Sequence, residues 1–274
     1  MNGIEIGIVD TRNIIRLINE LYHYDFSDFA LTSFKRRLEN LIAFHNLKFA
    51  DNLAVRLRED EEFFDVFLHE ILVEPTEMFR DPSLWRLLRD EYLPQIAKSN
   101  ACFKVWFPIS VSAEEILTFL ILIREIALTD KCEIIVSHIS KKSEEIIKSG
   151  RIKPTKIEVS KENYTRFHGT SKFEDYYTIK ENGIYFDKGL YKNIAFIKQD
   201  LTLDDSPKSI DLIFFRNQML YYNQVLQDRI LDILHESLSY NGYLVAGIRE
   251  KLAMTDVKKN LRLVDAHENI YQKK

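Results

Sequence analysis

The chain has 274 residues, which is enough to bury a sizeable core in one large domain or in a small domain plus a larger one. Apolar residues make up 46% of it and charged residues 29%, with 8 glycines and 6 prolines, so a disordered or fibrous chain is excluded. The net charge of -4, from 38 basic and 42 acidic side chains, argues against nucleic acid as a general partner.

The first hundred residues carry only helical periodicity. Ser27 and Pro82 are suitable first residues for two of the helices. The pattern predicts an N-terminal all-helical domain over residues 1–100. Apolar residues recur three and four positions apart in the segments 12–22, 27–45, 50–60, 61–73 and 82–98.

From residue 101 onward, strand-like runs alternate with helical segments. Such alternation predicts an α/β fold, with a doubly wound and largely parallel sheet covered by helices on both faces, over residues 101–274. The last helix is expected to end at Asn241-Gly242, before a strand at 243–248. The runs at 103–109, 132–139 and 209–217 precede helical segments at 113–128, 140–150 and 224–238.

Two further segments do not fit simple alternation. Residues 151–193 contain tyrosines, glycines and polar residues in a hairpin-like arrangement, which predicts a small inserted β element. Residues 261–274 read as two short strands around Ala266-His267-Glu268. We expect them to form an antiparallel pair that completes the edge of the sheet.

A doubly wound sheet binds its ligand at the carboxyl ends of its strands, where this chain carries the stretches PISVSAEE, SHIS, QDL and FRNQMLYY. The sequence resembles the CheR-type chemotaxis receptor methyltransferases, from SDFALTSFKRRL through VEPTEMFRDP and FRNQMLYYNQVLQDRI to NGYLVAG and NIYQKK. That family transfers a methyl group from S-adenosylmethionine to receptor glutamates and releases S-adenosylhomocysteine. The resemblance implies a class I methyltransferase fold behind an N-terminal helical domain.

The resemblance also implies roles for individual residues. Arg80 and Tyr221 would orient the substrate carboxylate near the transferred methyl group, while Thr76, Glu115 and Asn217 would hold the cofactor. Methyl transfer is an in-line displacement, so the enzyme mainly positions the nucleophile, and a guanidinium can hold a carboxylate by paired hydrogen bonds. The alternative is that Arg80 caps a helix or pairs with Asp81, and that Tyr221 is a packed aromatic.

The turn after the first predicted strand departs from the family pattern. Relatives read approximately W-x-A-G-C-S-T-G-E-E there, whereas Ile109 and Ala113 replace both glycines in this chain. Ile109 stands where the methionine part of the cofactor would lie, and a positive φ is costly for a β-branched residue. Pro108 removes a backbone donor as well.

Two other strand ends depart from the family too. His138 stands where an acidic residue accepts both ribose hydroxyls, and Asp200-Leu201 replaces an Asn-Leu pair beside the adenine. Three altered contacts predict weak or lost cofactor binding. Two alternatives stay open: a fully active receptor methyltransferase and a non-catalytic module that binds or regulates the receptor. A pocket adapted to another nucleotide-like ligand is a third.

The expected partner is the cytoplasmic region of a chemoreceptor or another signalling protein. The resemblance implies that the helix carrying Lys35, Arg36 and Arg37 faces the acidic methylation region, although an isolated basic cluster can equally be a solvated helix face. In that family the inserted β element can dock a receptor-tail peptide by strand addition, so the resemblance implies a possible peptide site in residues 151–193.

No metal site and no membrane insertion are expected. Cys102 and Cys132 lack the spacing of metal ligands, and we expect them to be reduced, buried thiols. The chain starts without a basic region followed by an apolar stretch, and no run reaches about 18 uncharged apolar residues. These features predict a cytoplasmic protein.

Overall fold

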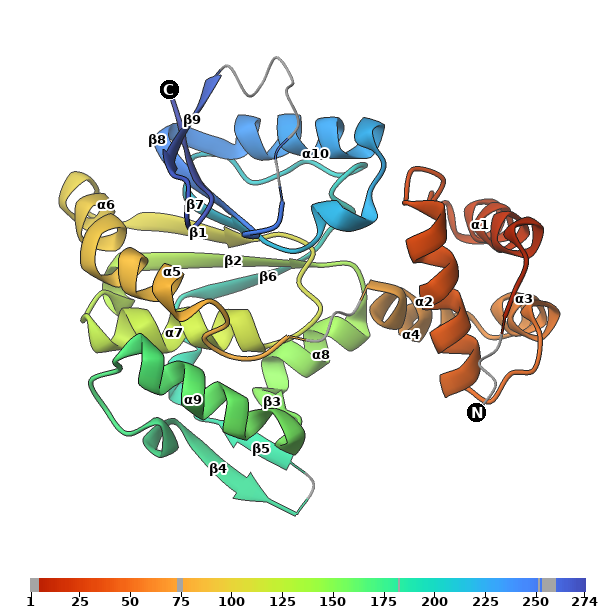
Figure 1. Ribbon diagram of the computed structural model, residues 1–274, viewed down its shortest axis with the longest axis horizontal. Helices are drawn as coiled ribbons and strands as arrows, with labels where there is room; N and C mark the ends of the chain where they lie inside the picture. Colours follow the sequence, from red (N-terminus) through yellow and green to blue (C-terminus); the bar gives the residue numbers. More distant parts are fainter. Residues whose placement is uncertain (1–4, 73–75, 182, 251, 253–259) are drawn as a thin grey trace.

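A computed structural model describes residues 5–72, 76–181, 183–250, 252 and 260–274 (Figure 1). Its first part is helical, as predicted, and in Figure 1 these helices stand together beside the sheet. Their inward faces form one apolar core, in which Phe34, Leu38 and Phe67 are at most 1% exposed. The helices are α1 (Ile8–Tyr22), α2 (Leu31–Phe44), α3 (Ala50–Glu59) and α4 (Glu61–Leu72). None of the helices in the described ranges has the length and apolar character needed to cross a bilayer.

The last predicted helix of the N-terminal half packs with the sheet. It consists of α5 (Pro82–Leu87), a π-helical turn (Leu88–Tyr92) and α6 (Leu93–Ser99), and it begins at Pro82 as predicted. Trp85 of α5 is 1% exposed and stacks on Phe214 of the sheet, with ring centroids 5.4 Å apart. The domain boundary near residue 100 stays a prediction. Because Trp85 belongs to the core of the sheet, we propose that the helical unit ends before α5.

The main sheet has seven strands, in the order β6-β2-β1-β7-β8-β10-β9. The pairs from β6 to β8 are parallel, and β10 is antiparallel to both of its neighbours. This order confirms the predicted methyltransferase-like α/β fold and the antiparallel pair at the edge. The strands are β1 (Phe103–Phe107), β2 (Cys132–His138), β6 (Ile194–Lys198), β7 (Ile210–Phe215), β8 (Leu238–Ala246), β9 (Leu261–Asp265) and β10 (Ile270–Lys273).

Side chains alternate between the two faces of the sheet, and each face has its own core. Val105 and Phe107 of β1 point to the face covered by α5 and α7 (Glu114–Glu125). Trp106, between them, points to the opposite face, which α10 (Gln224–Ser237) covers. Figure 1 shows α10 and α7 on opposite sides of the strands. This arrangement leaves the carboxyl ends of β1 and β7 open toward the helical unit.

The inserted segment forms a second, three-stranded sheet in the order β3-β5-β4, with β3 (Arg151–Ile152), β4 (Tyr177–Lys180) and β5 (Gly183–Phe186). All of its pairs are antiparallel, as a hairpin-like pattern predicts. Helix α8 (Lys141–Ser149) leads into the segment. A helix inside the segment, α9 (Ile157–Phe167), was not predicted.

Two local predictions were wrong. Ser27 does not begin a helix, because α2 starts at Leu31 and the preceding backbone is used to contact another loop. Helix α10 ends at Ser237, and Asn241-Gly242 lies inside β8. There Asn241 has a φ of 63°, and the pairing of β7 with β8 shifts register. The Asn-Gly signal therefore marks an irregularity within a strand rather than the end of a helix.

Helix α4 contacts α8 through a histidine that is neutral at pH 7. The His69 ring lies with Nδ1 3.0 Å from Ser143 Oγ, and burial followed by the charge of Lys142 lowers the pKa of His69 to about 4. The unfolded chain binds a proton near pH 6.5, so acidification favours unfolding between about pH 6.5 and pH 4. We expect this residue to remove up to about 3 kcal/mol of the free energy of unfolding over that interval.

Urea unfolding of wild type and His69→Gln at pH 7 and pH 4.5 checks this prediction. The glutamine keeps a polar partner for Ser143 but takes up no proton, so the variant is expected to lose less stability on acidification. Carboxylates titrate in the same interval in both proteins, and the difference between the two therefore isolates His69. Equal losses would show that its titration is not linked to folding.

Candidate functional site

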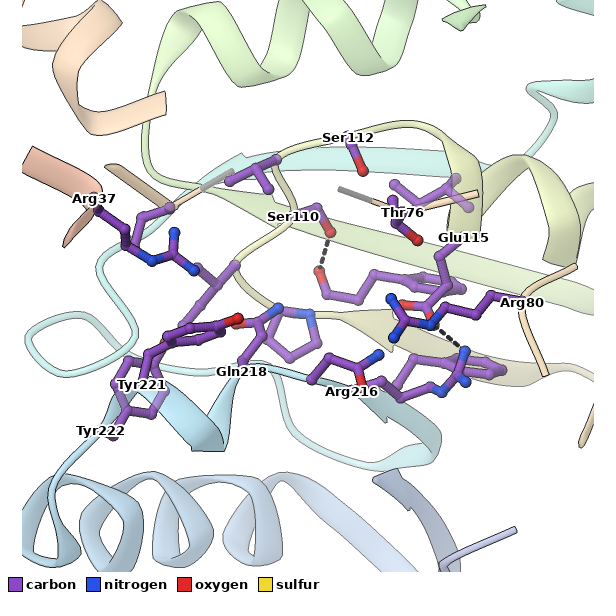
Figure 2. A pocket seen from close by; sticks show the side chains of 18 of the residues that line it. Arg37, Thr76, Arg80, Ser110, Ser112, Glu115, Arg216, Gln218, Tyr221 and Tyr222 are labelled. Carbon is purple, nitrogen blue, oxygen red and sulfur yellow. Dashed lines mark hydrogen bonds and ion pairs between the residues drawn. The ribbon is translucent and has the colours of Figure 1, made fainter. Parts of the chain in front are cut away.

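A pocket lies where β1 and β7 end, facing the helical unit (Figure 2). It encloses about 840 Å³ of empty space, including the open solvent at its mouth. Five of the residues predicted to be catalytic or cofactor-binding line it together: Thr76, Arg80, Glu115, Asn217 and Tyr221. In Figure 2 the side chains of Arg80 and Glu115 lie at one end and that of Tyr221 at the other. Segments far apart in the sequence therefore meet at one cavity.

The turn after β1 forms one wall of this pocket, and its backbone is unusual for its sequence. Ile109 has a φ of 51°, the left-handed region that β-branched residues avoid. The turn is fixed on both sides: the Ser110 N–H donates to the Ser137 carbonyl at 2.7 Å, and the Ser110 hydroxyl donates to the Phe107 carbonyl at 3.1 Å. The chain thus keeps a backbone shape that suits glycine while carrying an isoleucine.

Arg80 is carried on a second left-handed turn. Phe79 and Asp81, on either side of it, have φ values of 52° and 58°. The Phe79 N–H donates to the Thr118 hydroxyl at 2.9 Å, and the Trp85 indole donates to the Arg80 carbonyl at 2.8 Å. Buried side chains of α7 and α5 therefore hold the turn in place. Strained backbone of this kind is typical of functional sites, and here it presents the Arg80 side chain to the pocket.

A buried arginine connects this turn to the first turn of α7. Arg216 follows β7 directly, and its side chain is 2% exposed. Its guanidinium donates to Glu115 at 2.7 Å and to Asp81 at 2.5 Å. Both carboxylates are partly exposed. The ion-pair network therefore joins a buried guanidinium to two carboxylates that reach solvent at the edge of the pocket. No role was predicted for Arg216, although a basic residue directly after a buried strand is a usable signal.

Tyr221 is contacted by the helical unit. The guanidinium carbon of Arg37 lies 4.0 Å from the Tyr221 ring centroid, and its Nη1 donates to the Ile71 carbonyl at 2.6 Å. The Ala30 N–H donates to the Tyr221 carbonyl at 2.8 Å. Figure 2 shows Arg37 reaching over Tyr221 within the pocket. Arg37 therefore lines the cavity, while the prediction from the sequence placed it, with Lys35 and Arg36, on a helix that faces the receptor.

The other two members of that basic cluster lie elsewhere on α2. Lys35 forms an ion pair with Glu39 at 2.6 Å, and Glu39 also accepts the N–H of Ile6 at 3.1 Å. Arg36 is exposed. The three consecutive residues thus have different surroundings, as consecutive positions of a helix must. Their joint role as a receptor-binding face stays a prediction.

Asn217 sits in a loop organised by a buried carboxylate. It has a φ of 59°, and its N–H donates to Glu250 at 2.8 Å. Met219 and Gly247 donate their N–H groups to the same carboxylate, at 2.7 and 2.6 Å. Burial raises the pKa of Glu250, which is 3% exposed, and the N–H donors act in the opposite direction. A Cβ at Gly247 would lie 2.6 Å from this carboxylate, so the position requires glycine.

Three predicted cofactor residues are not among those that line the pocket. His138 is 2% exposed, and its Nδ1 lies 3.0 Å from the Ser140 carbonyl, which fits a donated N–H. Asp200 accepts from the N–H and the hydroxyl of Thr202, at 2.8 and 2.7 Å. Leu201 is 4% exposed and belongs to the core under α10. These three side chains therefore make hydrogen bonds or packing contacts with nearby residues rather than lining the pocket.

The described residues fit S-adenosylmethionine only in part. Thr76, Glu115 and Asn217 are available in the pocket, and they are the polar groups that the resemblance assigns to the cofactor. The two polar side chains that the resemblance assigns to the ribose and the adenine do not line the pocket. His138 and Asp200 make local hydrogen bonds instead.

Histidines and cysteines form no metal centre within the described ranges, where no three potential ligands gather. His45 instead lies with Nε2 2.7 Å from a carboxylate oxygen of Glu70. Both cysteines are free thiols, and the predicted burial is confirmed for only one of them. Cys132 is buried, whereas Cys102 is exposed because it precedes β1 rather than lying inside it.

Comparison with known proteins finds relatives over almost the whole chain. The family described as CheR methyltransferase, SAM binding domain, matches residues 74–269. A Pseudomonas putida protein named Cher3 is 28% identical over 265 residues, covering 97% of each chain. The chemotaxis protein methyltransferase of Listeria innocua is 22% identical over 238 residues, or 86% of this chain and 88% of that protein. The structure of N-methyltransferase NodS from Bradyrhizobium japonicum with S-adenosyl-L-homocysteine is 13% identical, with a TM-score of 0.37 over 69% of this chain and 85% of that one.

Proposed function

The chain belongs to the CheR methyltransferase family, and from that premise we propose that it is a chemotaxis signalling protein in which binding of S-adenosylmethionine is weak or lost. The family carries out methyl transfer from this cofactor. In the proposed role the chain keeps the partner-binding architecture of a protein-glutamate methyltransferase and acts mainly by binding or regulating its partner. Receptor glutamates are the substrate of any activity that it retains.

The observation that carries the proposal is the backbone of Ile109. Its φ of 51° preserves the conformation that suits glycine, yet its side chain lines the pocket where a bound molecule would approach that backbone. A β-branched residue in this region costs roughly 1–3 kcal/mol. The fold therefore retains the shape of a cofactor turn, while the close approach that the shape serves is obstructed. Local hydrogen bonds of His138 and Asp200 support the same conclusion.

The proposed partner is the cytoplasmic region of a chemoreceptor or another signalling protein. Relatives named chemotaxis protein methyltransferase, in Listeria and in Vibrio parahaemolyticus, support this assignment. We accordingly propose a cytoplasmic location. Arg80 and Tyr221 are proposed to contact the substrate carboxylate if methyl transfer occurs.

A fully active receptor methyltransferase is the second candidate. It is favoured by the convergence of the predicted catalytic pair, Arg80 and Tyr221, with three predicted cofactor residues in one pocket. The two candidates differ in a single measurable quantity, the affinity for the cofactor.

Isothermal titration of the wild-type chain with S-adenosylhomocysteine tests the proposal. Three mismatched contacts of about 1–3 kcal/mol each would weaken binding by several powers of ten, so we expect no micromolar binding. The Listeria innocua chemotaxis protein methyltransferase, titrated in the same buffer, serves as the positive control. Micromolar binding by the unmodified chain would reject the weak-binding proposal in favour of the active enzyme.

A further inference from the structure

The loop that carries Tyr221 is held at its two ends by different parts of the chain. It runs over residues 216–223, from the end of β7 to the start of α10. Near its beginning, the buried carboxylate of Glu250 accepts the N–H groups of Asn217 and Met219. Near its end, hydrogen bonds come from the loop between α1 and α2, which belongs to the helical unit. The position of Tyr221 therefore depends on a segment near the other end of the sequence.

The contact between these two loops resembles a short piece of antiparallel sheet. Phe29 and Tyr222 form an isolated antiparallel bridge, and their rings pack edge to face with centroids 5.0 Å apart. Beside the bridge, the Ala30 N–H donates to the Tyr221 carbonyl at 2.8 Å. The main chain of Tyr221 is thus hydrogen-bonded directly to the helical unit.

Asp28 adds a side-chain contact that the bridge alone does not provide. Its carbonyl accepts the N–H of Asn223, and its Oδ1 accepts from Nδ2 of the same residue, each at 2.8 Å. Because a carboxylate only accepts, this bond fixes which way the Asn223 amide points. The amide oxygen then accepts the Leu226 N–H at 3.0 Å and caps the first turn of α10. One carboxylate therefore ties the loop of Tyr221 both to the helical unit and to the start of α10.

The turn that carries Arg80 is held by elements outside the helical unit. Thr118 of α7 and Trp85 of α5 make hydrogen bonds to its main chain. Two polar side chains of α9 bind the N–H and the carbonyl of Met78, just before the turn. Figure 2 shows Arg80 and Tyr221 at opposite ends of the pocket. The separation of these two side chains therefore depends on how the helical unit is fixed to the sheet.

We propose that Asp28 is a positioning residue for Tyr221, and that through it the helical unit sets the separation of Tyr221 from Arg80 across the pocket. The inference rests on the proposed function, because it takes these two side chains to contact the substrate carboxylate. A group misplaced by about 1 Å can cost about 100-fold in rate, so this separation is a critical dimension of the site. The helical unit is thus part of the site, in addition to any partner surface that it carries.

Fluorine NMR of the full chain, with fluorotyrosine incorporated at position 221 alone, tests the proposal. Asp28→Ala removes the acceptor for the Asn223 amide, whereas Asp28→Asn keeps an oxygen acceptor of the same shape. We expect Asp28→Ala to shift or broaden the resonance and to speed hydrogen exchange of the Asn223 N–H at least about tenfold. Asp28→Asn should restore the wild-type resonance.

A second substitution reaches Tyr221 through the backbone. Ala30 has a φ of -61° and a ψ of 107°, and Phe29 before it lies in the bridge, so proline is compatible with the chain at position 30. Ala30→Pro removes the N–H and places a ring carbon where the hydrogen was. The Tyr221 carbonyl then has to move away, and the fluorine resonance should move with it.

Asp25→Ala is the matched control. Asp25 lies in the same loop and accepts the Ser27 N–H at 2.8 Å, so its removal perturbs the loop of the helical unit without touching the loop of Tyr221 directly. This variant should leave the resonance unchanged. Urea unfolding of every variant separates stability from position: lower stability with an unchanged resonance in both Asp28→Ala and Ala30→Pro would overturn the proposal. The same change in Asp25→Ala as in Asp28→Ala would overturn it too. No cofactor or substrate is added, so these outcomes are independent of the titration with S-adenosylhomocysteine.

Discussion

Replacing four residues together, by Ile109→Gly, Ala113→Gly, His138→Asp and Asp200→Asn, is expected to increase the affinity for S-adenosylhomocysteine at least about 100-fold over wild type. Each restored contact is worth about 1–3 kcal/mol, and 1.4 kcal/mol is a factor of ten in affinity. Thr76, Glu115 and Asn217 already line the pocket, so the substitutions complete a site that is half present. Isothermal titration of both proteins measures the change directly.

Most of the gain should come from the turn after β1. Glycine at position 109 relieves the left-handed strain and removes the side chain that lines the pocket, while Ala113 is 1% exposed and gives up only a methyl group. The His138 substitution gives less, because a new aspartate would lie near Glu144, which is 3.4 Å from the imidazole. The double variant Ile109→Gly/Ala113→Gly should therefore recover at least half of the gain in binding free energy.

Val111→Gly provides the matched control. Val111 lines the same pocket from the same turn but does not have the left-handed backbone. If this variant gains affinity as much as Ile109→Gly does, the improvement reflects a loosened turn rather than a restored approach of the backbone. If the quadruple variant gains nothing, the altered contacts are not what limits cofactor binding.

The sheet could be predicted from sequence because its strands and helices differ in hydrophobic period. Helix α9 was not predicted, because polar residues interrupt its buried face. Ser160 and Asn163 share that face with Tyr164 and Phe167, and they are held there by hydrogen bonds to the backbone N–H and carbonyl of Met78, at 3.2 and 3.1 Å. The apolar stripe on which the prediction depends is therefore incomplete. What buries its polar groups is the turn that carries Arg80, a long-range contact invisible in a local pattern.

The resemblance predicted pocket residues correctly only where the position of a residue in the fold is enough to place its side chain in the pocket. Glu115 and Asn217 flank the carboxyl ends of two central strands, and the fold brings them together wherever their side chains point. At His138 the position at a strand end was predicted, but the direction of the ring was not. Its hydrogen bond to the carbonyl of Ser140 depends on the first turn of α8. Side-chain direction is set by such neighbours, which differ even where the fold is shared.

Removing the buried guanidinium by Arg216→Met is expected to lower the free energy of unfolding by about 2–4 kcal/mol. Breaking a buried ion pair typically costs 3–5 kcal/mol, because the remaining charges stay desolvated. The side chains of Asp81 and Glu115 are 27% and 29% exposed, so water compensates for part of the loss. Methionine is chosen because it fills most of the volume of the arginine stem. Urea unfolding at pH 7 gives the measurement.

Two further variants separate charge from packing. Arg216→Lys keeps the charge but cannot bridge both carboxylates with a fork, so an intermediate loss of about 1–2 kcal/mol is expected. The triple variant Arg216→Met, Asp81→Asn, Glu115→Gln removes all three charges, and asparagine tolerates the φ of 58° at position 81. It should regain much of the stability that Arg216→Met loses, because no unpaired charge is left.

The same series decides what holds the turn that presents Arg80. If Arg216 acts by tethering Asp81, the single Asp81→Asn variant should cost less than Arg216→Met, because the arginine still bonds Glu115 at 2.7 Å. A triple variant no more stable than Arg216→Met would mean that the packing of the guanidinium, whose carbon lies 5.8 Å from the Trp85 ring centroid, contributes more than its charge. A loss below about 0.5 kcal/mol for Arg216→Met would contradict the ion network altogether, since surface charges behave in that way. In that case the left-handed turn would be held by its hydrogen bonds to Thr118 and Trp85 and, through Met78, to Ser160 and Asn163.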